Sequence, residues 1–221
     1  DSILPLVAGG VATAGASVLD QELRVSINPD PGRGWGRAVG TASGSVWGGA
    51  FVATLFATGR MSGNARFRAA SYDLADAALM NLVWSQSLKL IARRQRPNGT
   101  NKQSFPSGHA SNAFALAAVA ETHYGWKAGV PAYLLAGAVG ASRMKQDKHY
   151  LSDVVAGATL GYIVGRTVVR VNSRPVAGGS RQAAAVNVAD ATSTDTKRTI
   201  RMRFSLPIRQ KFKSGLEPKP L

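Results

Sequence analysis

Three glycines, Gly157, Gly161 and Gly165, follow one another at four-residue intervals and constrain how this chain can fold. They lie in a stretch of helical character over residues 152–171, and residues four apart share one side of a helix. Glycine has no side chain, so this side allows another backbone to come close. The spacing therefore predicts a helix that packs tightly against a second helix.

Helical patterns also cover most of the chain before this stretch. We expect helices over residues 4–23, 46–58, 71–94, 107–123, 131–144 and 152–171. The clearest pattern is an apolar face at helical spacing, formed by Leu74, Ala78, Leu82, Ser85, Leu88 and Ile91. Proline cannot continue a helix, so Pro97 marks the end of this one. The predicted fold class is all-α, a helical bundle.

The last part of the chain has a different pattern. Residues 173–180 resemble a linker, and beyond them the apolar residues Ile200, Met202, Phe204 and Leu206 alternate with polar ones. A period of two is typical of a strand, and residues 183–188 offer a partner strand. We predict a helical domain over residues 1–173 and a basic C-terminal extension over residues 174–221, for which a β-hairpin is one option.

The charge of the chain limits its partners. The net charge is +15, and residues 166–221 carry twelve basic and three acidic side chains of the total. Such a chain favours anionic partners: nucleic acid, phosphorylated substrates or an acidic membrane surface. The absence of cysteine excludes disulfides, thiolate zinc sites and a cysteine nucleophile. It also fits a periplasmic or otherwise exported protein, as does a first residue, Asp1, that is not methionine.

The longest uncharged run, residues 38–59, raises the question of a membrane. A spanning helix needs about 20 residues, so the run is long enough. Glycine, serine and threonine dilute its hydrophobicity, and the other apolar runs are shorter. We interpret these stretches as buried helices of a soluble bundle, with a membrane-embedded bundle as the alternative.

Four consecutive residues, Pro106, Ser107, Gly108 and His109, precede an alanine-rich helical stretch. Serine is a good N-cap, and a helix N-terminus presents unpaired N–H groups that attract anions. Gly108 would let a ligand approach this backbone, with His109 beside it. Alone, the pattern has a simpler explanation: an N-cap followed by an incidental surface histidine.

Two further stretches place cations and a second histidine at predicted helix ends. Lys89 and Arg96 are seven residues apart, two helical turns, so both can hold one phosphate. His149 and Asp153 are four apart, a spacing at which the carboxylate orients the imidazole on a helix. Arg143, after Ser142, precedes them. The structural alternatives are a basic helix C-terminus, which explains Arg93 and Arg94, and a His–Asp hydrogen bond without a catalytic role.

Together, the three stretches resemble the type 2 phosphatidic acid phosphatase superfamily, which includes class A acid phosphatases and vanadium haloperoxidases. Its signature is Lys-x6-Arg-Pro, Pro-Ser-Gly-His and Ser-Arg-x5-His-x3-Asp, and every position is filled here, between Lys89 and Asp153. The segment between Pro97 and Pro106 is shorter than in many members. The resemblance says little about residues before 71 or after 171.

The resemblance implies a role for each motif residue. The phosphate oxygens would be bound by Lys89, Arg96, Ser107, Gly108 and Arg143. His149, oriented by Asp153, would attack phosphorus, and His109 would protonate the leaving oxygen as general acid. No metal or other cofactor is needed, and vanadate is expected to bind as an inhibitor. The third histidine, His123, lies outside the motifs and is interpreted as structural.

The expected function is that of a metal-independent phosphatase. It would hydrolyse phosphate or pyrophosphate esters, above all lipid phosphates, through a phosphohistidine. Phosphatidic acid, prenyl pyrophosphate, lipid A phosphate and soluble monoesters all remain open as substrates. The alternatives are a vanadate-dependent haloperoxidase and a non-catalytic basic protein that binds membranes or nucleic acid. We expect no nucleic-acid partner, because the aromatic-rich basic patches of single-strand binders are missing, and we expect the basic extension to contact anionic membranes.

Overall fold

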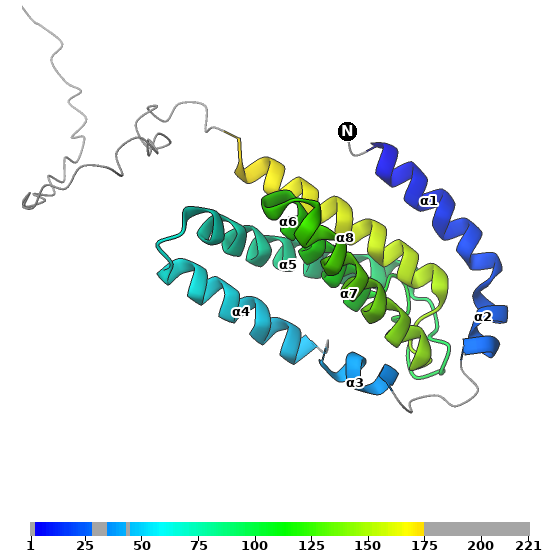
Figure 1. Ribbon diagram of the computed structural model, residues 1–221. Helices are drawn as coiled ribbons and strands as arrows, with labels where there is room; N and C mark the ends of the chain where they lie inside the picture. Colours follow the sequence, from blue (N-terminus) through cyan, green and yellow to red (C-terminus); the bar gives the residue numbers. More distant parts are fainter. Residues whose placement is uncertain (1–2, 28–34, 43–44, 175–221) are drawn as a thin grey trace, which may run out of the picture. The chain divides into compact units, whose positions relative to one another are not determined.

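The computed structural model describes residues 3–27, 35–42 and 45–174, and these residues are entirely helical apart from the connecting loops (Figure 1). The helices are α1 (Ile3–Val18), α2 (Asp20–Ile27), α3 (Trp35–Ala42), α4 (Ser45–Met61), α5 (Ala65–Ala92), α6 (Gly108–Tyr124), α7 (Trp126–Lys145) and α8 (Leu151–Asn172). The all-α prediction is confirmed for this part of the chain. The predicted extension and its β-hairpin lie, apart from Arg174, outside the described residues.

Several helix boundaries differ from those predicted. The single helix expected over residues 4–23 is two helices, α1 and α2, which meet at Leu19 with a bend of 63°. Helix α3 is not among the predicted helices. Helix α5 begins earlier than predicted, at Ala65, because the side chain of Asn64 caps it by accepting a hydrogen bond of 3.0 Å from the backbone N–H of Phe67.

Helix α6 is the central element of the bundle. It packs against α5, α7 and α8, while α1 lies along α8, α4 lies along α5, and α3 contacts α7 (Figure 1). Buried apolar residues on α6 are small, mainly alanines and Val119, which permits close packing on three sides. The N-terminus of α6 is thereby surrounded by the ends of its neighbours.

The glycine repeat of α8 packs against α6, as predicted. A Cβ atom at any of the three glycines would collide with a backbone carbonyl oxygen of α6 or its N-cap. These oxygens belong to Ser107, Ser111 and Ala115, facing Gly157, Gly161 and Gly165 respectively. The contact brings the start of α8, with Asp153, next to the start of α6, with Ser107.

The apolar face predicted on α5 is buried only in part: Ser85 is buried and Leu74 packs against the core. Leu82 and Ile91 are 54% and 78% exposed. The side buried against other helices is instead composed of small or polar residues: Ala70, Ser71, Asp73, Ala77, Asn81, Ser85 and Lys89. The prediction assumed that apolar side chains point inward, whereas here small residues form the helix contacts and larger apolar ones lie outside.

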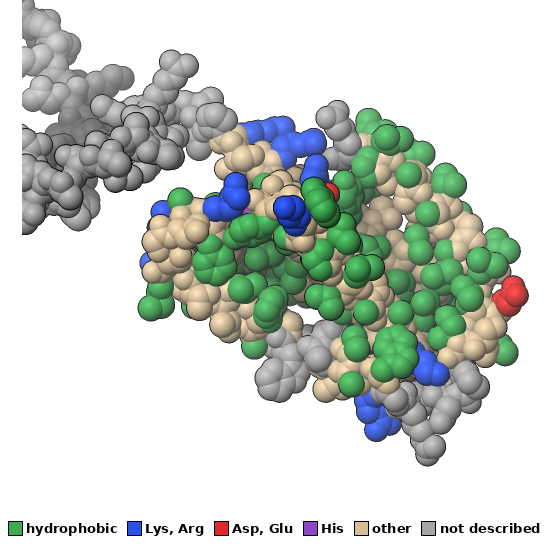
Figure 2. Space-filling model, in the orientation of Figure 1, with side chains coloured by type: hydrophobic (Ala, Val, Ile, Leu, Met, Phe, Trp, Pro, Cys, Tyr) green, Lys and Arg blue, Asp and Glu red, His purple; other side chains and the backbone are tan. Residues whose placement is uncertain are grey.

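Large apolar side chains cover the outer faces of other helices as well. Exposed ones occur on α1, α4 and α7, including Ile3, Leu4, Leu6, Val7, Val11, Phe51, Val130, Leu134 and Leu135. Figure 2 shows that apolar side chains cover much of the described part of one face, whereas most Lys and Arg side chains lie toward its ends. Our interpretation of the runs in α4 and α7 as buried helices was therefore wrong. Among the described residues, α8 is long and apolar enough to cross a membrane, and so is the bent pair of α1 and α2 taken together.

Candidate active site

The predicted site residues meet at one end of the bundle. Helices α5 and α7 end there, and α6 and α8 begin there, so residues from all three motifs become neighbours. Lys89 lies near the end of α5 and Arg143 near the end of α7, while Asp153 is in the first turn of α8. Four helix ends therefore place groups that are up to 64 positions apart in the chain around one location.

Lys89 connects α5 to the loop that carries the second motif. Its ammonium group donates to the backbone oxygens of Gln103, at 2.8 Å, and Pro106, at 2.6 Å. The side chain is buried, and the charges of Arg96, Asp153 and Arg143 all act on it. Lys89 thus holds the loop before Ser107 and adds positive charge to the same place.

Three buried polar atoms in the described part of the chain lack a hydrogen-bond partner. They are the Nε atoms of Arg96 and Arg143 and the hydroxyl oxygen of Ser107. Buried polar groups are almost always paired, and leaving one unpaired costs about 1–3 kcal/mol. All three belong to the predicted phosphate-binding set, although they come from a loop, a helix end and a helix start. Their convergence forms a donor set suited to an anion.

Lys148, a further cation, lies near Arg96 and Arg143 of this set. Burial, and then the charges of Arg143 and Arg96, lower the pKa of Lys148 in the loop before α8. Burial also lowers the pKa of Arg96, which the negative charge of Asp153 opposes. This end of the bundle therefore carries an excess of positive charge that a phosphate would offset.

Ser107 occupies the N-cap position of α6 as predicted, but its side chain does not cap the helix. Its hydroxyl is buried and unpartnered, and its backbone N–H donates to the backbone oxygen of Asp153 at 2.9 Å. The predicted N-cap position is therefore confirmed, whereas the simpler explanation, a serine whose side chain only caps the helix, does not hold. The hydroxyl is available to a ligand because the contact with α8 fixes the backbone instead.

His149 lies in the loop before α8 rather than on the helix, which changes the predicted pairing with Asp153. Its Nδ1 atom is 2.7 Å from the backbone oxygen of Ser104 and 3.7 Å from Oδ2 of Asp153. A carbonyl oxygen only accepts, so Nδ1 carries the proton and Nε2 has the lone pair. The Ser104 carbonyl therefore orients the imidazole, with the Asp153 carboxylate beside it.

Asp153 is fully buried and organises the surrounding loops. Its Oδ2 atom accepts hydrogen bonds from the hydroxyl of Ser104 and, at 2.9 Å, from the backbone N–H of Tyr150. Its Oδ1 atom accepts from Nη1 of Arg94 at 2.8 Å. These bonds fix the carboxylate next to both Ser104 and His149.

The surroundings keep His149 in its neutral form. Burial is the main cause that lowers the pKa of His149, and the charges of Lys89 and Arg96 act in the same direction. The neighbouring Asp153 carboxylate opposes them without reversing the direction. A neutral imidazole with an unprotonated Nε2 has the lone pair that a nucleophile needs.

His109 is the second residue of α6 and belongs to the same end of the bundle. The charges of Arg143 and His149 act on its half-buried ring. The remaining histidine, His123, is near the opposite end of α6, where Nε2 lies 2.7 Å from Oδ2 of Asp73. The structure thus brings His109 and His149 together and leaves His123 apart from both.

Three residues that contact the site were missed from the sequence: Ser104, Arg94 and Asp20. Arg94 had been assigned to a helix end favoured by the dipole, but it binds Asp153. Ser104 is adjacent to the second motif and carries no distinguishing local signal. Asp20 contacts Ser152 and Arg94 from α2, far away in the sequence.

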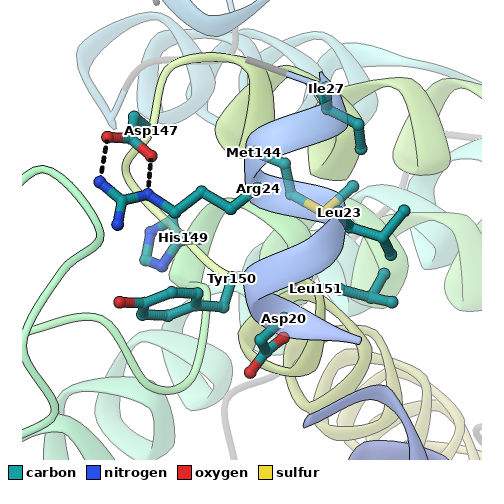
Figure 3. Close-up of a pocket in the computed structure, with 9 residues that line it drawn as sticks. All are labelled: Asp20, Leu23, Arg24, Ile27, Met144, Asp147, His149, Tyr150 and Leu151. Atoms are coloured by element: carbon teal, nitrogen blue, oxygen red, sulfur yellow. Dashed lines mark hydrogen bonds and ion pairs between the residues drawn. The ribbon is translucent and has the colours of Figure 1, made fainter. Parts of the chain in front are cut away.

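Helix α2 also forms one wall of a small pocket (Figure 3). The opposite wall comes from the end of α7 and the loop before α8, and it includes His149 and Tyr150. Arg24 of α2 spans the pocket edge with an ion pair of 2.9 Å to Asp147. A helix outside the three motifs therefore contributes to the immediate surroundings of His149.

Comparison with known proteins agrees with the motifs. The family model of the PAP2 superfamily matches residues 73–176. A lipid A 1-phosphatase of Porphyromonas gingivalis is 41% identical over 75 residues, which are 33% of this chain and 17% of that protein. The match thus spans about a sixth of the length of this relative.

Two solved structures share the fold. A transmembrane PAP2-type phosphatidylglycerolphosphate phosphatase from Bacillus subtilis has a TM-score of 0.64 and 17% identity, covering 77% of this chain and 95% of its own. LpxE from Aquifex aeolicus has a TM-score of 0.57 and 22% identity, covering 69% of this chain and 95% of its own. These two likenesses concern the fold, while the family model agrees with the superfamily inferred from the three motifs over residues 73–176.

Proposed function

We propose that this chain is a metal-independent phosphatase of the PAP2 superfamily that hydrolyses lipid phosphates through a phosphohistidine. The observation that carries the proposal is a set of three buried donor atoms without a partner, the Nε atoms of Arg96 and Arg143 and the hydroxyl of Ser107, near a histidine with an unprotonated Nε2. The relatives named above are phosphoric ester hydrolases by their descriptions, which supports the same reaction class.

The proposed reaction has two steps. In the first, Nε2 of neutral His149 attacks phosphorus, and the bond from phosphorus to the ester oxygen breaks. His109, which takes up a second proton when the anionic substrate is bound beside it, gives that proton to the leaving oxygen. In the second, water attacks the phosphohistidine, the nitrogen–phosphorus bond breaks, and His109 takes a proton from the water. Inorganic phosphate leaves, and both histidines return to their starting protonation states.

Charge stabilisation in this reaction comes from side chains. The donors of Arg96, Arg143 and Ser107 would bind the equatorial oxygens, on which negative charge is spread in the transition state. Lys89 would add charge while holding the loop that carries Ser107. Preorganised donors gain their effect because they are already desolvated and in place when the reaction occurs.

A lipid substrate is supported by the outer surface of the bundle. Exposed apolar residues on α1, α4, α5 and α7 suit a hydrocarbon environment, and in lipid the helix contacts are made by small residues, as between α6 and α8. We propose that these helices lie in a membrane, with the candidate active site at one membrane surface. A phosphorylated lipid headgroup would then meet the site without leaving the bilayer.

The distribution of cations supports an orientation in this membrane. The end opposite the site carries exposed basic residues: Arg60, Arg66, Arg68, Lys127, Arg166, Arg170 and Arg174. Basic residues next to spanning helices favour the cytoplasmic side. At the site end, fewer basic side chains of the described residues are exposed, namely Arg37, Arg93 and Lys102, while others, such as Arg24, Arg94 and Arg143, belong to the site or its ion pairs. We therefore propose that the site faces away from the cytoplasm, as expected for a periplasmic activity.

The chemistry is tested by trapping the intermediate. Purified protein is mixed with ³²P-labelled phosphatidic acid, lipid A phosphate and a soluble monoester, and quenched within one turnover. A label that His149→Ala abolishes, that is stable to alkali and that acid removes supports the phosphohistidine. Phosphate release without a label on His149 would contradict the mechanism, and halide oxidation with added vanadate would instead indicate a haloperoxidase.

The orientation is tested with single cysteines, since the chain has none of its own. Lys102→Cys lies at the site end and Lys127→Cys at the opposite end, and both side chains are exposed. In intact cells a membrane-impermeant maleimide should label the first and not the second. Labelling of both positions, or of Lys127→Cys alone, would contradict the proposed orientation.

A further inference from the structure

Asp20, the first residue of α2, is buried next to the candidate active site although it lies outside the three motifs. Its carboxylate accepts two hydrogen bonds from Ser152, from the backbone N–H at 2.9 Å and from the hydroxyl at 2.6 Å. It accepts a third from Nη2 of Arg94 at 2.7 Å. These donors satisfy a buried charge that would otherwise be costly, so Asp20 is held in one orientation.

Arg94 connects this carboxylate to Asp153. Its Nη1 atom donates to Oδ1 of Asp153 at 2.8 Å and to the hydroxyl of Ser152 at 2.7 Å. The guanidinium lies 4.3 Å from the ring centre of Tyr150. The planar fork of arginine can bind two carboxylates at once, which lysine cannot do. Arg94 is therefore held between Asp20 and Asp153, with Tyr150 against its face.

The backbone of Arg94 reaches the other group that orients His149. Its carbonyl oxygen accepts a hydrogen bond of 3.0 Å from the N–H of Ser104, whose own carbonyl accepts from Nδ1 of His149. The same residue thus supports Ser104 through its backbone and Asp153 through its side chain. A displacement of Arg94 would disturb both neighbours of the histidine.

We propose that Asp20 and Arg94 are positioning residues of the active site. Asp20 fixes the guanidinium of Arg94, and Arg94 fixes the Asp153 carboxylate and the Ser104 loop on either side of His149. Neither residue would touch the phosphate. The inference rests on the proposed function, and it extends the functional part of the chain to α2, outside residues 73–176 that match the superfamily.

The test begins with Asp20→Asn, which keeps the shape of the side chain but removes its charge. A small misplacement of a catalytic group costs up to about 100-fold in rate, so we expect kcat for phosphate release to fall between about 10- and 100-fold. Substrate contacts remain, so KM should change by less than about threefold. Arg94→Lys, which retains the charge but not the fork, should behave similarly.

A double-mutant cycle separates positioning from a general loss of structure. If Asp20 acts through Arg94, then adding Asp20→Asn to Arg94→Lys should change kcat by less than about twofold, because coupled residues are not additive. The matched control is Lys145→Gln, which removes a 3.0 Å hydrogen bond from Lys145 to the backbone oxygen of Ile27 at the other end of α2. Its kcat should stay within about twofold of the wild type, as independent sites allow.

Two outcomes would overturn the proposal: effects of Asp20→Asn and Arg94→Lys that multiply, or a Lys145→Gln variant that loses as much kcat as Asp20→Asn. Either would mean that Asp20 only attaches α2 to the bundle. These outcomes can be told apart from a failure of the proposed function, because in that case the wild type itself would release no phosphate from any lipid phosphate. The ¹⁵N NMR signals of the His149 ring, assigned by their loss in His149→Ala, report which ring nitrogen carries the proton, and they need no activity measurement. Unchanged signals in Asp20→Asn would also refute the positioning role of Asp20.

Discussion

The Nδ1 atom of His149 lies 2.7 Å from the backbone oxygen of Ser104, closer than it lies to the Asp153 carboxylate. A backbone carbonyl cannot titrate, so it holds the imidazole in one tautomer at any pH at which the fold persists. The carboxylate adds negative charge and supports the Ser104 side chain. Orientation and electrostatic support of the histidine are thus divided between two residues.

This division leads to different effects for the two partners. Ser104→Ala removes the hydroxyl but keeps the carbonyl acceptor, so we expect kcat to fall by less than about tenfold and unfolding free energy by about 1–3 kcal/mol. Asp153→Ala removes one of the two carboxylates that bind Arg94 and leaves the Ser104 hydroxyl and the Tyr150 N–H without their acceptor, so it should cost more, about 3–5 kcal/mol. Phosphate release and urea unfolding of both variants check this ranking. A Ser104→Ala variant as inactive as His149→Ala would contradict it.

The pH dependence of the reaction should reflect His149. Attack requires the neutral imidazole, and burial with nearby cations lowers the pKa of His149 in the folded protein. The neutral form therefore persists to lower pH than for an ordinary histidine of pKa about 6.5. The acidic limb of kcat/KM, which reports the free enzyme, should lie below this value. Loss of activity with a midpoint above pH 7 on the acidic side would conflict with a neutral nucleophile.

The variant Ser107→Ala should lose activity without losing stability. The hydroxyl is buried and has no partner in the fold, so its removal should leave the unfolding free energy unchanged or higher. Loss of one transition-state donor typically costs about 100- to 1000-fold in kcat. Inhibition by vanadate, a mimic of the five-coordinate transition state, should weaken in parallel. Equal vanadate inhibition in variant and wild type would remove Ser107 from the phosphate site.

Removal of divalent metals should leave turnover unchanged. In the proposed reaction, Lys89, Arg96 and Arg143 stabilise the charge that a metal would otherwise bear. The measurement is phosphate release before and after dialysis against EDTA, with Mg²⁺ added back. Activity that disappears with EDTA and returns with the metal would refute the side-chain mechanism.

Gly161→Ala tests the contact between α8 and α6. The added methyl group would collide with the carbonyl oxygen of Ser111, and overpacking of this kind costs about 1–3 kcal/mol. Gly137→Ala in α7 is the matched control, because a Cβ atom there meets nothing within 4 Å. Alanine favours a helix over glycine by about 1 kcal/mol, so this variant should be as stable as the wild type or more stable. Thermal unfolding that ranks the two variants in the opposite order would contradict the packing.

Much of the fold was predictable because helical periodicity is a local property. The six predicted helices all occur, although α1 and α2 are separate and α3 was missed. The start of α6 and the close packing of the α8 glycines were also predicted correctly. The apolar face predicted on α5 is buried only in part, because its pattern cannot show whether Leu82 and Ile91 face protein or a surrounding apolar phase.

The sequence by itself determined the helices, the three motifs and the small-residue side of α8, since each depends on residues within a few turns of one another. Only the tertiary structure decided that Ser104 is the acceptor for His149 and that Asp20 supports Asp153 through Arg94. Asp20 and Ser152 are 132 positions apart, and Ser104 and His149 are 45 apart. Hydrogen bonds between such residues depend on how whole helices pack, and close packing through small residues brings their ends within reach.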